Sequence, residues 1–206
     1  MHISEGVLSP AVLTGGAVLA AAGVWAGLRR VDYDRLMQVA ILSAVFFVGS
    51  LIHVPVGLGS AHLILNGLLG VLLGWAVFPA LLVALLLQAL LFQFGGLTVL
   101  GVNVATMGAG GILAHYLCRS CCRLPHYGPL LGGFLAGAAG VLAAGVLTAA
   151  ALALSGEAFQ TAARLVLLAH LPIMIAEGCL TLFTVNFLMR VRPGILPFAC
   201  PARRLS

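Results

Sequence analysis

The stretch that decides the fold is residues 63–94, LILNGLLGVLLGWAVFPALLVALLLQALLFQF, an apolar run of 32 residues. A bilayer crossing needs about 20 apolar residues. As one α-helix this run would be about 48 Å long, which is too long for a single crossing. Proline disrupts a helix interior, and Pro79 lies in the middle of the run. The sequence therefore predicts two short helices, about 63–78 and 80–94.

The composition of the whole chain is that of a membrane protein. Of its 206 residues, 62% are hydrophobic and 7% are charged, whereas soluble domains carry about 25% charged residues. The net charge of +5 comes from arginines at segment ends and no lysine, a pattern that indicates membrane topology and not nucleic-acid binding. Residues 1–6 contain no Lys or Arg, so we expect no cleaved signal peptide and a retained N-terminus. One transmembrane domain is predicted over 1–206.

Five further apolar segments complete a predicted all-α, seven-transmembrane-helix bundle; they are residues 7–28, 36–52, 103–118, 128–154 and 164–189. With seven crossings, every arginine except Arg164 falls on one face, as the positive-inside rule requires. Without a break near Pro79 the CRSCCR segment (118–123) would move to the opposite face. The prediction therefore places the N-terminus outside and residues 191–206 in a cytoplasmic tail.

Three loop segments gather polar side chains at the predicted outer face. They are MHISEG (1–6), HVPVGLGSAH (53–62) and QFGGLTVLGVN (93–103), and their polar residues are His2, Glu5, His53, His62, Gln93 and Asn103. Histidines concentrated at one end of a membrane protein suggest a metal site or a proton relay. The alternative is a set of ordinary polar groups at the membrane interface.

The first two residues favour the metal site on chemical grounds. A free α-amine on Met1, the next amide nitrogen and the His2 imidazole can close two fused chelate rings around one ion. A fourth nitrogen, for which we choose His62, would complete a square N4 site, the geometry that suits Ni(II) or Cu(II). Gly57 and Gly59 would let the loop approach an inserted N-terminus closely.

The segments MHISEGVLSP (1–10), SAHLILNGLLG (60–70) and FGGLTVLGVN (94–103) together resemble the CbiM/NikM family. These proteins are substrate-binding (S) components of energy-coupling-factor transporters for cobalt and nickel. The resemblance implies a seven-helix bundle with the N-terminus inserted from the extracytoplasmic side of a bacterial or archaeal plasma membrane. It implies Met1, His2 and His62 as metal ligands and Asn103 as a group that orients them.

Two positions near the implied ligands keep more than one interpretation. Many members of the family carry Asn where this chain has His53, so His53 could be a ligand, an entry residue or a polar substitute, and we favour the last. Glu5 could cap the inserted N-terminal segment or attract cations. Nickel and cobalt both remain possible substrates, and no organic cofactor is expected.

The implied partners follow from what the chain lacks. It has no lysine and hence no phosphate-binding Gly-Lys-Ser/Thr motif. The resemblance implies that the partners are ATPase subunits, a transmembrane coupling (T) subunit and, in many systems, a small accessory membrane subunit. Membrane lipid surrounds the chain and these membrane subunits. No His-Glu-x-x-His motif is present, so the chain is not expected to be an enzyme.

Glu177 and His170 are the intramembrane polar candidates. They lie seven residues apart, and this spacing places them on one face of the last helix. A carboxylate at this depth is costly and is by default a candidate for function. It either bonds neighbouring helices or, with His170, relays protons in a proton-coupled secondary metal transporter, which is the alternative function.

Overall fold

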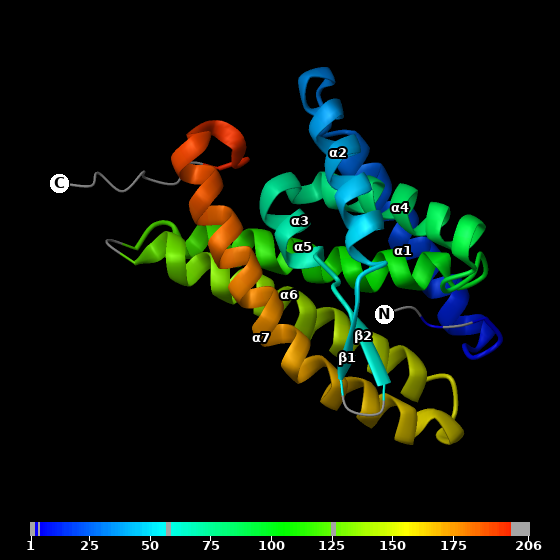
Figure 1. Cartoon of the computed structure of the whole chain (residues 1–206). Helices are drawn as coiled ribbons and strands as arrows, with labels where there is room; N and C mark the ends of the chain where they lie inside the picture. Colours follow the sequence, from blue (N-terminus) through cyan, green and yellow to red (C-terminus); the bar gives the residue numbers. More distant parts are fainter. Residues whose placement is uncertain (1–2, 4, 57–58, 125–126, 199–206) are drawn as a thin grey trace.

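The structure is a computed structural model that describes residues 3, 5–56, 59–124 and 127–198. Its helices and strands are shown in Figure 1. In chain order they are α1 (Pro10–Leu28), α2 (Tyr33–Gly49), β1 (His53–Val56), β2 (Gly59–His62), α3 (Asn66–Leu73), η1 (Gly74–Ala76), α4 (Val77–Phe92), α5 (Leu100–Cys121), α6 (Gly128–Ala153), η2 (Glu157–Phe159), α7 (Gln160–Val191) and η3 (Pro193–Ile195). The all-α prediction is confirmed except for one two-stranded hairpin.

Four stretches of the described chain are long and apolar enough to cross a bilayer: Pro10–Leu28, Asn66–Phe92, Gly128–Ala153 and Glu157–Val191. Helices of this length and hydrophobicity make the chain a membrane protein, because long apolar helices are stable in the hydrocarbon core of a bilayer. The count of seven crossings and the placement of the N-terminus outside stay predictions.

The long apolar run is divided at a different place from the predicted one. Helix α3 ends at Leu73, and the turn η1 follows before α4 begins at Val77. Gly74 has a positive φ of 57°, which glycine adopts without the cost that a side chain would bring. Pro79 is the third residue of α4, where its missing N–H leaves no helical hydrogen bond unmade. The prediction of a break at Pro79 was therefore wrong by a few residues.

Residues 53–56 and 59–62 form two paired strands where the sequence predicts a loop. Strands β1 and β2 pair in antiparallel register from His53 opposite His62 to Val56 opposite Gly59. The sequence places His62 directly before the predicted helix 63–78, but in the structure His62 ends β2, and α3 begins four residues later at Asn66. This difference matters for His62, because the position of a residue at the end of a paired strand depends on the strand's hydrogen bonds and on the segment that follows it.

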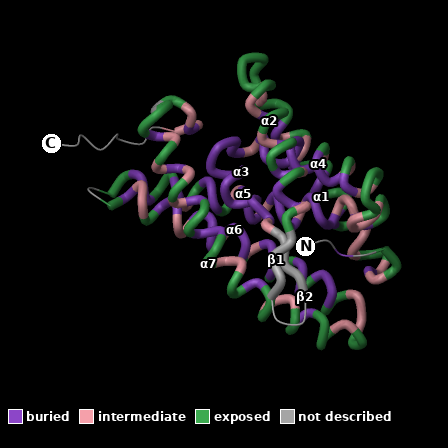
Figure 2. Tube along the Cα trace, viewed as in Figure 1, coloured by how far each residue is buried: buried purple, intermediate pink, exposed green. Residues whose placement is uncertain are grey.

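Helix α3 lies at the centre of the fold, and each of its residues, Asn66–Leu73, is buried. Figure 2 shows this short helix as continuously buried, beside the buried stretches of α5 and α6. Glycines make the close approach possible. A Cβ added at Gly67 would meet the α6 backbone at Ala136 and Gly137, and one added at Gly70 would overlap the carbonyl of Gly111 on α5. Small residues are the usual means of close helix packing in lipid.

The segment after α7 folds back onto the helices. Leu196 is buried in the main apolar core. The Phe198 ring lies 5.3 Å from the His115 ring of α5 in an edge-on contact. The first part of the predicted tail therefore packs against the bundle, while its cytoplasmic location stays a prediction.

Candidate metal site

The three predicted ligands are described only in part. Met1 and His2 lie outside the described residues. The backbone of His62 is described as the end of β2, directly opposite His53 in the strand pairing, whereas the side chains of residues 53–62 lie outside the described part. Among the described residues, no group of three or more His, Cys, Asp or Glu side chains is placed to hold a metal ion.

The N-terminal segment, here residues 3 and 5–9, packs against the helix bundle. Ile3 is buried, and its backbone N–H donates a hydrogen bond to Oδ1 of Asn103 over 3.3 Å. Asn103 lies in the first turn of α5 and is itself 4% exposed. Ile3 and Leu8 share an apolar cluster with Val99 and with residues of α5, α6 and α7. The residue that follows His2 is therefore held by a buried amide.

Glu5 forms the second attachment of the N-terminal segment. Its Oε1 accepts hydrogen bonds from the backbone N–H of Thr98 over 3.2 Å and from the Thr98 hydroxyl over 3.3 Å. A Cβ on Gly96, whose φ is +145°, would overlap the Glu5 side chain. The glycine-rich loop before α5 thus leaves room for this carboxylate, which joins the N-terminal segment to Thr98.

Glu177 is completely buried on α7. Its Oε1 accepts two backbone N–H groups, from Ile64 over 2.5 Å and from Leu65 over 2.8 Å. These residues belong to the β2–α3 connection (63–65), which begins immediately after His62. The carboxylate therefore bonds the segment that carries a predicted ligand, a partner that the sequence did not indicate.

His170 is buried on the same helix two turns before Glu177. Its Nδ1 lies 2.5 Å from the carbonyl oxygen of Val166 in the preceding turn. A Cβ added at Gly145 of α6 would lie 3.0 Å from Cδ2 of the His170 ring. His170 therefore packs at the contact between α6 and α7.

Asn66 is a buried polar residue that the sequence analysis missed. Its Nδ2 donates to the carbonyl oxygens of Met107 on α5 and Gly140 on α6, over 3.2 and 3.0 Å. Its Oδ1 accepts the N–H of Gly67 at the start of α3. The available signal was a single amide inside the apolar stretch LILNGLLG. Together Glu177 and Asn66 fix the β2–α3 connection to α5, α6 and α7.

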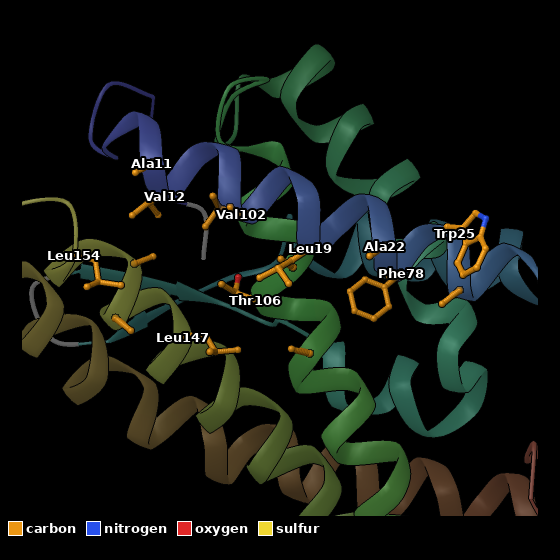
Figure 3. A pocket seen from close by; sticks show the side chains of 18 of the residues that line it. Ala11, Val12, Leu19, Ala22, Trp25, Phe78, Val102, Thr106, Leu147 and Leu154 are labelled. Carbon is orange, nitrogen blue, oxygen red and sulfur yellow. The ribbon is translucent and has the colours of Figure 1, made fainter.

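A separate cavity of 930 Å³ lies between α1, α5 and α6. Figure 3 shows its lining, in which Leu19 and Val102 face Leu147 and Leu154 across the space. Almost all lining side chains are apolar, and none of the candidate site residues is among them. The cavity therefore does not provide ligands for a divalent cation.

The fold and the buried hydrogen bonds of Asn103 and Glu177 define the class of protein. It is a helical membrane protein in which the N-terminal segment and the β2–α3 connection are both bonded to the helix bundle. A family model described as the cobalt uptake substrate-specific transmembrane region, CbiM, matches residues 2–195. The chain therefore belongs to the CbiM family, whose members are components of metal transport systems and not enzymes.

Individual relatives agree with this assignment. A provisionally named metal transport protein of Haemophilus influenzae is 46% identical, covering 95% of this chain and 97% of the relative. The cobalt transport protein CbiM of Sorangium cellulosum is 35% identical, covering 95% and 94% of the two chains. The fused nickel transport protein NikMN of Rhodobacter capsulatus is 34% identical, covering 88% of this chain and 55% of that protein.

A solved structure supports the fold as well as the family. The crystal structure of a truncated transition metal transporter superimposes with a TM-score of 0.74 at 28% identity, covering 93% of this chain and 99% of the other. The fold described above is therefore shared with a transporter of transition metals.

Proposed function

We propose that this chain is the high-affinity nickel- or cobalt-binding subunit of an energy-coupling-factor uptake transporter. The ion is held by the α-amine of Met1, the amide and imidazole nitrogens of His2, and the imidazole of His62. It enters from the extracytoplasmic side, loses its water shell and is enclosed by the N-terminal segment. Binding by deprotonated nitrogen ligands in a square arrangement favours nickel, and cobalt is the substrate named for several relatives.

The observation that best supports the proposal is the burial of Ile3 and its hydrogen bond to Asn103. A chain terminus is usually poorly ordered unless specific contacts tie it down. Here the contacts of Ile3, Glu5 and Leu8 tie this segment to the start of α5 and its neighbours. A terminus used only to begin α1 would not need a buried amide partner.

The site depends on the groups that orient its ligands, and Asn103 gives the first test. We expect Asn103→Leu to lower nickel affinity by about 10–100-fold, the usual cost of losing a group that orients a metal ligand. Leucine keeps the volume but cannot accept the Ile3 N–H. Calorimetric titration of the purified protein with Ni²⁺ measures the change.

The matched control is Asn186→Leu. Asn186 lies near the C-terminal end of α7 and is partly buried. Among the contacts described, it bonds only the Leu182 carbonyl of its own helix. It should bind nickel as the wild type does. Equal affinity in the Asn103 variant would show that this amide does not support the site.

Release of a tightly held ion needs energy from partner subunits, because the chain has no lysine for a phosphate-binding loop. We expect the isolated chain in liposomes to bind nickel without accumulating it. Added ATPase and transmembrane coupling subunits should give uptake that requires ATP. The measurement is ⁶³Ni inside the vesicles, with a non-hydrolysable ATP analogue as the control.

The same vesicles test the proton-coupled alternative. Accumulation by the isolated chain under a pH gradient, without ATP, would refute energy coupling through ATPases and favour a carrier using Glu177 and His170. The structure gives Glu177 two backbone N–H partners, which is an arrangement for holding a segment in place.

A further inference from the structure

The buried carboxylate of Glu177 bonds backbone that neither β2 nor α3 uses. The strand pairing ends at His62 opposite His53, and the first residue of α3 is Asn66. The N–H groups of Ile64 and Leu65 fall between the two elements, and both residues are buried. A buried N–H that has no acceptor is destabilising, and one oxygen of Glu177 satisfies both.

The backbone at this point has a conformation that needs such support. Leu65 has φ 52° and ψ 6°, in the left-handed region that residues with a side chain rarely adopt. Strained residues persist where surrounding contacts determine them, and they cluster at ligand sites. The Leu65 N–H bond to Glu177 is one of those contacts, and the Asn66 side-chain bonds to α5 and α6 are further ones.

Glu177 lies at a close contact between α7 and α6. It lies on α7 facing α6, where a Cβ added at Gly137 would overlap the Glu177 carbonyl and approach the Thr181 hydroxyl. The two long helices α6 and α7 therefore form a fixed platform, and the carboxylate projects from it to the β2–α3 connection. The two hydrogen bonds offset part of the cost of burying a polar side chain at this depth.

We propose that Glu177 is a positioning residue, which fixes the backbone after β2 and thereby holds His62 at the place where the metal is bound. The inference rests on the proposed function, because it takes His62 as a ligand. Ile64 follows that ligand by two residues, so a shift of its N–H moves the end of the strand. Glu177 acts through this backbone and does not touch the ion.

The test compares five variants by Ni²⁺ calorimetry and by the visible absorption spectrum of the bound nickel. Glu177→Gln keeps a carbonyl oxygen at the same reach and should bind within about threefold of wild type, with an unchanged spectrum. Glu177→Leu removes the acceptor and should bind about 10–100-fold more weakly, with a shifted spectrum. Glu177→Asp keeps the carboxyl group but withdraws its oxygens by one methylene, and we expect a loss of the same order.

Thr181→Val is the matched control. Thr181 is one turn further along α7 and equally buried, and its hydroxyl has no hydrogen-bond partner in the described part of the chain. It should leave affinity and spectrum unchanged. Should Glu177→Leu fail to fold, the Asp and Gln variants decide the matter, since the proposal requires Asp to weaken binding and Gln to preserve it.

The outcomes separate the inference from the function it rests on. If His62→Ala binds nickel normally, the ligand assignment is wrong. If His62→Ala abolishes binding while Glu177→Asp and Glu177→Leu bind with wild-type affinity and spectrum, Glu177 has only a structural role and the inference is overturned. A lower melting temperature alone, with native affinity in the folded protein, would lead to the same conclusion.

Discussion

One residue added before Met1 should abolish tight nickel binding. The added residue converts the α-amine into an amide, which is a poor ligand, and it moves the new amine out of the chelate ring that includes His2. Loss of a group that only orients a ligand costs about 10–100-fold in affinity, so loss of a ligand should exceed about 100-fold. Calorimetry with Ni²⁺ on otherwise identical purified proteins gives the measurement.

The control for the extension is the same residue placed after Ser206, which should bind like the wild type. His2→Ala and His62→Ala should show the same loss as the extended protein, since each removes a member of one chelate. His53→Ala should cost less than about tenfold, because we interpret His53 as a polar residue outside the ligand set. Native affinity in the extended protein would rule out the amine as a ligand.

The apolar segments could be predicted from sequence because hydrophobicity over a span is a local property. The division of residues 63–94 was predicted, but its position was not. Proline is the stronger sequence signal, yet Pro79 falls in the first turn of α4, where it is tolerated. Gly74 carries the actual turn through a positive φ, and nothing distinguishes it in sequence from the other glycines of the run.

The hairpin could not be recognised because strand pairing depends on a partner segment, and HVPV and GSAH show no clear alternation. Its discovery changes the interpretation of His62, which is placed by β2 and the connection after it. A segment that looks like a glycine-rich loop in a membrane protein can thus contain regular structure.

The polar candidates were identifiable, but their partners were not. Asn103 was expected to matter through the family resemblance, Glu5 through its place in the N-terminal segment, and Glu177 because a carboxylate within the membrane is costly. Their hydrogen bonds, however, join residues about a hundred positions apart: Ile3 with Asn103, and Ile64 with Glu177. Such pairings follow from tertiary packing, which the sequence of one chain does not show, and Asn66 was missed for the same reason.

The second large effect is expected at the crossing of α3 and α5. Gly70→Ala should lower the melting temperature by roughly 6–12 °C, because overpacking of about 3 kcal/mol acts on a domain of this size. The added Cβ would overlap the Gly111 carbonyl, which is backbone and cannot rotate away. Helix α3 would have to move off α5, and it carries Asn66 and the connection after His62 with it. Thermal unfolding in detergent measures the shift.

Gly15→Ala is the matched control for this substitution, because a Cβ on Gly15 of α1 would meet nothing within 4 Å. Alanine is the better helix former by about 0.5–1 kcal/mol, so this variant should melt at the wild-type temperature or slightly above it. The comparison separates the cost of a methyl group at a helix crossing from the general effect of replacing glycine. If both variants melted alike, close backbone contact between α3 and α5 would not stabilise the bundle, and the central position of α3 would need another explanation.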